Sequence, residues 1–209
     1  MKKSGGHPWQ QVPLAVYEGH MRLRSVGQLQ ALDELYLERL SAYPSETVAF
    51  WGIAGGNGLS HIRPGQYRAV YGVDINEAYL AACRERFIAL KELVLLALDL
   101  SKPVTLPSAD LVFADLLIEY IGIDAFAARV HSAKPKTLCC TIQQNLAQAF
   151  VSPSPYAQAL EAIGALHQDI AEADLCNSLQ QQGYLLLYRK AVPLNSAKQL
   201  LRLDYMLTD

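Results

Sequence analysis

Short apolar segments that each end at an aspartate recur along the middle of the chain. They are residues 67–73, 93–98 and 110–114, which are followed by Asp74, Asp99 and Asp115. Helical patterns separate them, including one that Asn76 can cap and one over 124–132. Strands that alternate with helices form a parallel sheet covered on both faces, because right-handed crossovers carry the chain over one face or the other. We therefore expect a doubly wound α/β fold whose strand carboxyl ends share one edge, where such folds bind ligands.

Further elements are expected on both sides of this repeat. A capping box at Ser25–Gln28 predicts the start of a first amphipathic helix, which would end before Pro44. The remaining segments are a strand at 47–51, a brief helix at 59–63, a strand at 136–142, helices at 156–164 and 171–182, and strands at 184–190 and 199–207. The last two strands are joined only by 191–198, so we expect them to be antiparallel neighbours.

The N-terminal residues 1–24 differ from the rest. Their proline and glycine content argues against a regular covering helix, and their aromatic and polar mixture suits a lid. We expect residues 1–45 to supply this lid and the first helix, as part of the same domain as residues 46–209.

Composition and charge exclude several classes of protein. The chain has 209 residues, of which 51% are hydrophobic and 18% charged, so we expect one domain with a large core. A net charge of -2 supplies no basic field for nucleic acid, and no apolar run is long enough to suggest a membrane span. The four cysteines lack zinc spacing and are expected to be reduced. These features favour a cytoplasmic protein, a monomer or homodimer, without a metal site.

The most distinctive motif is the glycine-rich stretch 48–59, VAFWGIAGGNGL. Its small residues follow a predicted strand and precede a helix, so the backbone can approach a ligand closely there. The stretch does not fit the dinucleotide fingerprint GxGxxG, which disfavours a nicotinamide enzyme. An ordinary glycine-rich turn is the alternative interpretation.

Asp74 lies 22 residues after Gly52, at the end of the predicted second strand. An acid in this place accepts hydrogen bonds from ribose hydroxyls in doubly wound folds, because a carboxylate offers several acceptor sites to a diol. The alternative is a helix N-terminal charge ahead of Asn76. Asp99 and Asp115 occupy the same topological position on the next two strands.

From about Thr47 to the C-terminus, these motifs resemble the class I S-adenosylmethionine-dependent methyltransferases. The resemblance implies the strand order 3-2-1-4-5-7-6, with strand 7 antiparallel, and S-adenosylmethionine as cofactor. The cofactor contacts that it implies are Gly52, Ala54, Gly56, Asn57 and Gly58 at the methionine part, Asp74 and Ile75 at the ribose, Asp99 and Leu100 at the adenine, and Asp115 and Leu116 at the methyl donor. Two positions depart from the family pattern: Phe50 stands where an acid is common, and Ala54 replaces the second glycine.

Two further segments supply candidates for the acceptor side. The stretch 17–21, YEGHM, concentrates polar and aromatic groups before the first helix, which suits a segment that covers the cofactor. The alternative interpretation is a capping loop in which His20 forms a hydrogen bond with the backbone. Residues 143–167 form the second segment. The candidate substrate contacts are Tyr17, Glu119, Tyr120, Asn145 and Tyr156, and the candidate catalytic bases are His20, Glu18 and His167, with Glu119 as a further option.

The resemblance implies transfer of a methyl group to an oxygen, nitrogen or carbon nucleophile of a small molecule, with S-adenosylhomocysteine as product. Two other functions stay open at this point. One is an NAD(P)-binding oxidoreductase on a similar sheet, and the other is a degenerate methyltransferase-like domain that binds without catalysis.

Overall fold

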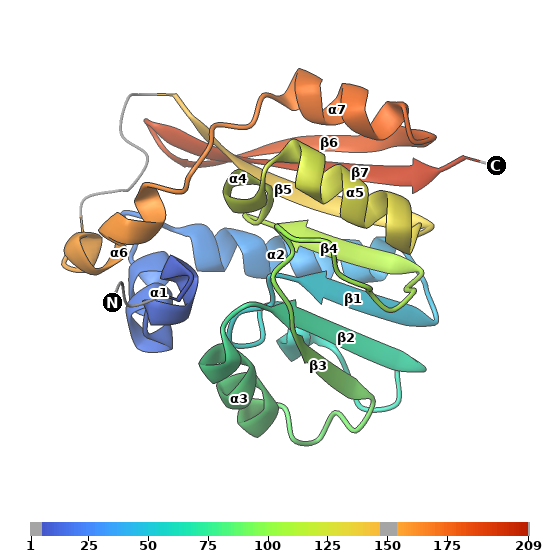
Figure 1. Ribbon diagram of the computed structural model, residues 1–209, viewed down its shortest axis with the longest axis horizontal. Coiled ribbons are helices and arrows are strands. Elements are labelled where there is room, and N and C mark those ends of the chain that lie inside the picture. Colours follow the sequence, from blue (N-terminus) through green and yellow to red (C-terminus); the bar gives the residue numbers. More distant parts are fainter. Residues whose placement is uncertain (1–5, 147–153, 209) are drawn as a thin grey trace, which may run out of the picture.

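In the computed structural model, which describes residues 6–146 and 154–208, these residues form one seven-stranded sheet with helices on both faces (Figure 1). The sheet order is β3-β2-β1-β4-β5-β7-β6, and β7 runs antiparallel to both of its neighbours. The strands are β1 (Thr47–Trp51), β2 (Ala69–Asp74), β3 (Leu93–Ala97), β4 (Leu111–Asp115), β5 (Thr137–Asn145), β6 (Tyr184–Asn195) and β7 (Lys198–Leu207). The predicted fold class and strand order are confirmed.

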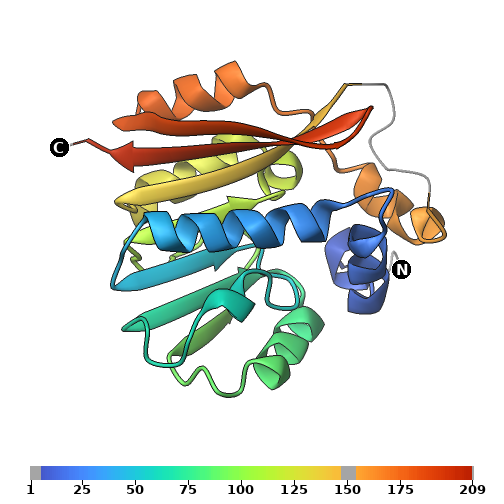
Figure 2. The same ribbon diagram turned by 180° about the vertical axis from the view of Figure 1, so that it is seen from behind.

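The helices divide into two layers and a group at one end of the sheet. They are α1 (Leu14–Arg22), α2 (Gln28–Ala42), α3 (Glu77–Arg86), α4 (Ile118–Ile121), α5 (Ile123–Ala133), α6 (Ala157–Gly164) and α7 (Glu172–Gln180), with 3-10 turns η1 (Pro8–Gln11) and η2 (Leu59–His61). Helices α5 and α7 cover one face, and α2 covers the other (Figures 1 and 2). None of the helices in the described ranges is both long and apolar enough to cross a membrane.

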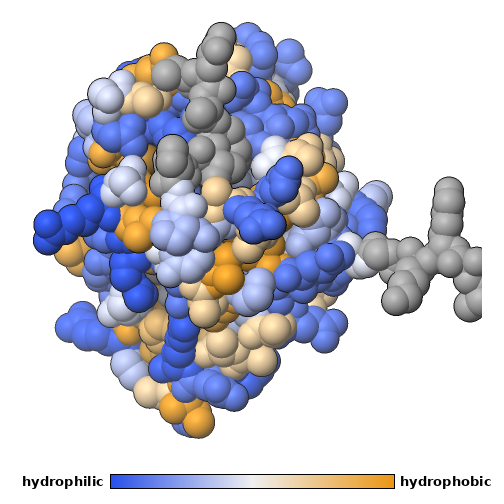
Figure 3. Space-filling model, turned by 90° about the vertical axis from the view of Figure 1, so that its left-hand side faces the viewer, coloured by the Kyte–Doolittle hydropathy of each residue, from blue (hydrophilic) through white to orange (hydrophobic). Residues whose placement is uncertain are grey.

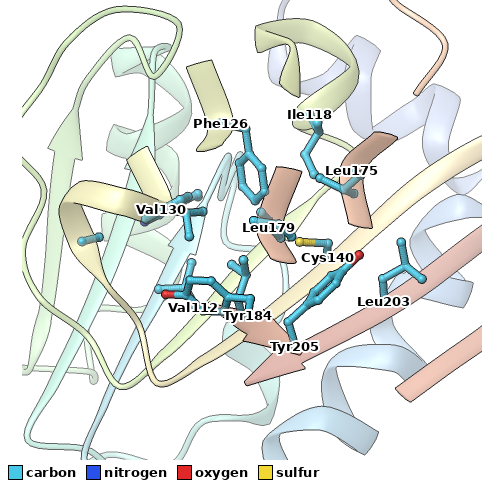
Figure 4. Close-up of a cluster of buried hydrophobic side chains, with 14 of the residues drawn as sticks. Val112, Ile118, Phe126, Val130, Cys140, Leu175, Leu179, Tyr184, Leu203 and Tyr205 are labelled. Atoms are coloured by element: carbon cyan, nitrogen blue, oxygen red, sulfur yellow. The ribbon is translucent and has the colours of Figure 1, made fainter. Parts of the chain in front are cut away.

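Each face of the sheet has its own core. Figure 4 shows the core beneath α5 and α7, where Phe126 and Leu175 pack on Val112 and Cys140 of the central strands. The other core joins α2 and α3 to the opposite side chains of the same strands. Because β1 and β4 are buried along their whole length, they are the rigid centre from which the site is built.

The C-terminal hairpin is tighter than the sequence indicates. Strands β6 and β7 pair up to Asn195 and Lys198, so that residues 196 and 197 alone connect them. The expected link at 191–198 is therefore wrong. Pro193 is tolerated within β6 because this strand lies at the edge of the sheet, where a missing backbone donor costs little.

The structure corrects two expectations about the N-terminal helices. Residues 14–22 form a regular helix, α1, after Pro13 at its N-cap, where a backbone N–H has no helical partner to lose. Gly19 lies inside this helix, and its lack of a side chain is needed there because a Cβ atom would come 2.7 Å from the Tyr156 ring. The predicted capping box at Ser25–Gln28 is absent, since the N-cap of α2 is Gly27 with a φ of 69°. The Asn76 cap of α3 is confirmed.

Candidate active site

A pocket lies at the carboxyl ends of the parallel strands, centred on β1, which has β2 on one side and β4 on the other. Its floor comes from the loops after β1, β2, β3 and β4, and its far wall comes from β5 and β7. The segment before α2 and helix α6 cover it, at the left of Figure 1. Figure 3 views the molecule from this side and shows apolar side chains gathered among polar ones. This is the edge at which doubly wound sheets bind ligands.

The loop after β1 is held in an unusual backbone conformation. Gly52 has a φ of 77°, and Ala54 has a φ of 50°, which non-glycine residues adopt at a cost. Asp74 of β2 fixes this loop, because its Oδ2 accepts a hydrogen bond of 2.9 Å from the Ala54 N–H. Gly52 and Ala54 line the pocket, as predicted for residues that approach a ligand.

Asp74 lines the pocket and is tied to the backbone through both oxygens. Oδ1 accepts a second bond of 2.9 Å from the Asn76 N–H. Burial raises the pKa of Asp74, although these N–H donors act in the opposite direction. A carboxylate has about four acceptor positions, so the backbone donors leave acceptor capacity for a ligand.

Asp99 also lines the pocket, at the end of β3. It accepts bonds from the backbone and hydroxyl of Ser101, and its Oδ2 lies 3.0 Å from the Lys102 ammonium. Burial alone would raise the pKa of Asp99, but these partners lower it below its ordinary value. Asp99 is therefore an ionised acid at the pocket rim with partial solvent access.

Asp115 closes the set of strand-end acids and belongs to a buried ionic network. Its Oδ1 lies 2.7 Å from the Arg39 guanidinium of α2, and both side chains are almost completely buried. Arg39 also donates to Asp204 of β7 and to the Cys140 carbonyl and Thr141 hydroxyl of β5. Asp115 Oδ2 is buried and has no hydrogen-bond partner among the described residues.

Glu119 of α4 is the most deeply buried acid of the pocket, with 1% of the residue exposed. Its Oε1 accepts a bond of 2.7 Å from the Gln143 N–H, whereas Oε2 has no hydrogen-bond partner in the described part of the chain. Burial, and to a lesser extent the nearby Asp115, raise the pKa of Glu119 to about 7 against the lowering effect of the Gln143 N–H. Glu119 is thus a carboxylate poised to exchange a proton near neutral pH.

This pKa predicts a pH-dependent stability. Because the folded pKa of about 7 exceeds the ordinary value of 4.5, the folded state binds the proton more tightly, and stability falls as pH rises from 4.5 to 7. The full penalty above pH 7 is about 3 kcal/mol. Glu119→Gln should therefore have a clearly larger free energy of unfolding than the parent at pH 8 and a similar one at pH 4.5. Denaturant titration at the two pH values measures this difference. The exposed Glu161→Gln is the control, and an equal difference at both pH values would contradict the assignment.

The part of the pocket formed by α1, α2, β5 and β7 carries amide groups and the basic side chains of His20 and Lys198. The Gln28 amide donates to Gln143 Oε1 at 2.6 Å, and Gln143 in turn donates to Asn145. His20 Nδ1 lies 2.9 Å from the Ser154 hydroxyl, and burial together with Lys198 lowers the pKa of His20. His20 is consequently a neutral imidazole at neutral pH.

Aromatic rings close the pocket from the N-terminal side. Trp9 meets Tyr120 edge to face at 4.9 Å, and Tyr17 stacks on Tyr79 at 6.0 Å. Burial raises the pKa of Tyr17 to about 12, and its hydroxyl accepts a bond from Asn57. The rings make the covered part of the pocket largely apolar.

Several predicted residues line this pocket and several do not. Those that line it are Tyr17, His20, Gly52, Ala54, Asp74, Ile75, Asp99, Leu100, Asp115, Leu116, Glu119 and Tyr120. Those outside the lining are Glu18, Gly56, Asn57, Gly58, Asn145, Tyr156 and His167. Glu18 pairs with Arg86, and a Cβ at Gly56 or Gly58 would meet aromatic rings of the core, so these positions are occupied by protein contacts. Residues 147–153 of the predicted acceptor segment lie outside the described residues.

Sequence reasoning missed pocket residues that come from remote elements. They include Trp9, Gln28, Tyr79, Gln143 and Lys198. Tyr79 is 2% exposed, and its hydroxyl has no partner among the described residues. The aromatic content of residues 1–24 was the available signal for Trp9, whereas Gln28, Tyr79 and Lys198 carry no local motif.

No protein-family model matches the sequence, and no curated protein matches it. Solved structures do resemble it. The methyltransferase domain of bacterial CtHen1-C superposes with a TM-score of 0.63 at 14% identity over 87% of this chain and 100% of that chain. Magnesium protoporphyrin IX methyltransferase from Synechocystis PCC 6803, solved with S-adenosylhomocysteine, has a TM-score of 0.62 at 18% identity, over 88% of this chain and 84% of that chain. The chain has the fold of class I S-adenosylmethionine-dependent methyltransferases.

Two more neighbours show how widely this methyltransferase fold is used. A Haemonchus contortus phosphoethanolamine N-methyltransferase has a TM-score of 0.66 at 12% identity, over 94% of this chain and 57% of that chain. The [4+2]-cyclase SpnF has a TM-score of 0.62 at 12% identity, over 85% of this chain and 80% of that chain. A shared fold therefore does not fix the reaction, which has to be argued from the pocket residues.

Proposed function

We propose that the protein is an S-adenosylmethionine-dependent methyltransferase that acts on an oxygen, nitrogen or carbon nucleophile of a small molecule. The observation that carries this proposal is the convergence of Asp74, Asp99 and Asp115 with the strained Gly52–Ala54 loop in one pocket. Neighbours solved with S-adenosylmethionine or S-adenosylhomocysteine support it.

The pocket residues fit such a cofactor. The acceptor positions left on Asp74 suit a ribose diol, and the unpartnered Tyr79 hydroxyl lies in the same lining. Asp99, in the same lining, would accept from an adenine amine. The buried Oδ2 of Asp115 lacks a partner in the described residues and would accept from the ammonium of the methionine part. When bound, the cofactor would supply a methyl group activated by a sulfonium.

The rest of the pocket would align the acceptor and exclude water. Methyl transfer needs an in-line approach of the nucleophile, so positioning supplies most of the rate enhancement. The cap formed by η1, α1 and α6 covers the pocket with apolar and aromatic side chains, which suits a small acceptor.

A domain with this fold and a reaction other than methyl transfer, or with binding alone, is the second candidate. The cyclase among the structural neighbours favours it. Titration calorimetry with S-adenosylmethionine, S-adenosylhomocysteine and NAD⁺ separates the candidates. We expect heat with the first two ligands alone, followed by transfer of radiolabelled methyl groups in a screen of small molecules. Binding without transfer to any acceptor would favour the second candidate, and the absence of all binding by folded protein would refute the proposal.

Asp74→Ala should weaken binding of S-adenosylhomocysteine by about 10- to 150-fold, because it removes charge-assisted hydrogen bonds worth about 1.5–3 kcal/mol. It also releases the Ala54 N–H that Asp74 holds. Asp99→Ala should cost less, since water can replace one contact at the partly open rim. Calorimetry measures both variants, with the exposed Asp124→Ala as control. A larger loss for Asp99→Ala would reverse the two roles.

A further inference from the structure

Glu119 carries a buried oxygen that the fold does not use. Its Oε1 is fixed by the Gln143 N–H, which sets the orientation of the whole carboxyl group. Glu119 lines the pocket, and its Oε2 is buried and has no hydrogen-bond partner in the parts of the chain that the structure describes. A buried carboxylate oxygen is costly without a donor, so this position awaits a hydrogen-bond donor from a ligand.

The surroundings of Glu119 favour a cationic donor. The charged side chain that acts on it most strongly is Asp115, another acid, which also has an unpartnered buried oxygen. The next residue, Tyr120, lines the pocket beside Trp9, and aromatic faces attract ammonium groups. Two acids beside aromatic rings would disfavour an acceptor on which negative charge develops, such as an alkoxide or a carbanion.

We propose, on the basis of the methyltransferase function above, that the acceptor is an amine and that Oε2 of Glu119 binds its protonated nitrogen and removes the proton. Glu119 sits four residues after Asp115, which the proposed function places at the cofactor. Both residues line the pocket and interact electrostatically, so we place the Glu119 carboxylate beside the cofactor, where an acceptor would meet it.

The proposed step balances in atoms and charge. The N–H proton of the ammonium passes to Glu119 Oε2, which frees the nitrogen lone pair. That lone pair forms the bond to the methyl carbon while the carbon–sulfur bond breaks and its electrons stay on sulfur. The products are the methylated ammonium, S-adenosylhomocysteine and a protonated Glu119, which returns its proton to water.

The acid strength of Glu119 suits an amine better than an alcohol. An alkyl amine has an ordinary pKa of about 10, as in lysine, so the proton moves to a carboxylate of pKa about 7 over a moderate gap. An alcohol is far less acidic, and the same carboxylate could not ionise it to a useful extent.

The test uses sinefungin, a cofactor analogue in which an amine-bearing carbon replaces the methylsulfonium. Its ammonium occupies the place at which methyl group and acceptor nitrogen meet. The parent should bind sinefungin at least tenfold more tightly than S-adenosylhomocysteine in titration calorimetry. Glu119→Gln should lose that preference and retain its S-adenosylhomocysteine affinity within twofold, whereas the control Glu161→Gln should keep both. Circular dichroism of each variant confirms its folding.

Each outcome is decisive. A preference that survives in Glu119→Gln, or that the parent lacks, overturns the amine assignment. Equal loss of both ligands in Glu119→Gln would instead make Glu119 a cofactor contact. A parent that binds neither ligand defeats the proposed function rather than the amine inference. As a second arm, radiolabelled methyl transfer to benzylamine and tyramine is compared with transfer to benzyl alcohol. Methylation of oxygen alone, unaffected by Glu119→Gln, would also overturn the proposal.

Discussion

Replacing Arg39 with alanine should lower the free energy of unfolding by about 3 to 5 kcal/mol, the cost of leaving a buried charge without its partner. Arg39 is completely buried and contacts β4, β5 and β7 at once. Asp204 would keep Arg202 and Tyr43 as partners, so most of the cost falls on Asp115. Because Asp115 lines the pocket, cofactor affinity should fall as well.

Urea titration of the parent and the variant at pH 7 measures this effect. The matched control is Arg68→Ala, whose side chain is 74% exposed and whose loss should change stability by less than about 0.5 kcal/mol. A change for Arg39→Ala as small as that of the control would show that the network does not stabilise the fold. Asp115→Asn in the same background tests whether removing the orphaned charge restores part of the stability.

Deletion of residues 1–24 should leave the sheet folded but reduce methyl transfer by roughly 100-fold or more, the scale expected when reacting groups lose their alignment. The deleted segment supplies Trp9, Tyr17 and His20 to the pocket. It contributes Met21 and the partly buried Tyr17 to one of the two main cores, which are otherwise built from the sheet and the helices after it. Activity should therefore fall far more than the melting temperature.

A point variant tests the same cap without a truncation. Gly19→Leu would push α1 away from α6, because the Tyr156 ring lies 2.7 Å from an added Cβ. Ala15→Leu, on the exposed side of α1, is the matched control. We expect Gly19→Leu to lower transfer and to increase hydrogen exchange over residues 14–22. If the protein without residues 1–24 turned over its acceptor normally, the segment would serve only to pack against the rest of the fold.

Much of the pocket floor could be predicted because it follows from local sequence. An apolar strand followed by an acid places that acid at the strand's carboxyl end, and parallel strands bring these ends together. Asp74, Asp99 and Asp115 therefore meet at the edge that the sequence indicates. The Asn76 cap depends only on bonds to Ala78 and Tyr79, two and three residues away.

The N-terminal segment illustrates where local reasoning fails. Glycine and proline argued against a helix, but Pro13 stands at the N-cap of α1 and Gly19 faces Tyr156 at a close helix crossing. Propensity describes an isolated segment, whereas the contact with α6 decides whether the helix is stable. The same limit applies to Glu18, which the sequence offers as a base and the fold pairs with Arg86.

The amino-acid sequence by itself determined the alternation of strands and helices and the acids along the sheet edge, because these depend on periodicity and on the direction of each strand. The strand order was expected only from the resemblance to a known family. Only the tertiary structure decided which side chains share a charge or a hydrogen bond across the pocket. Arg39 reaches Asp204 across 165 positions, and Gln28 reaches Gln143 across 115. Such pairs leave no spacing in the sequence, since they form only when packing brings separate elements within a few ångströms, and burial then sets the acidity of a group such as Glu119.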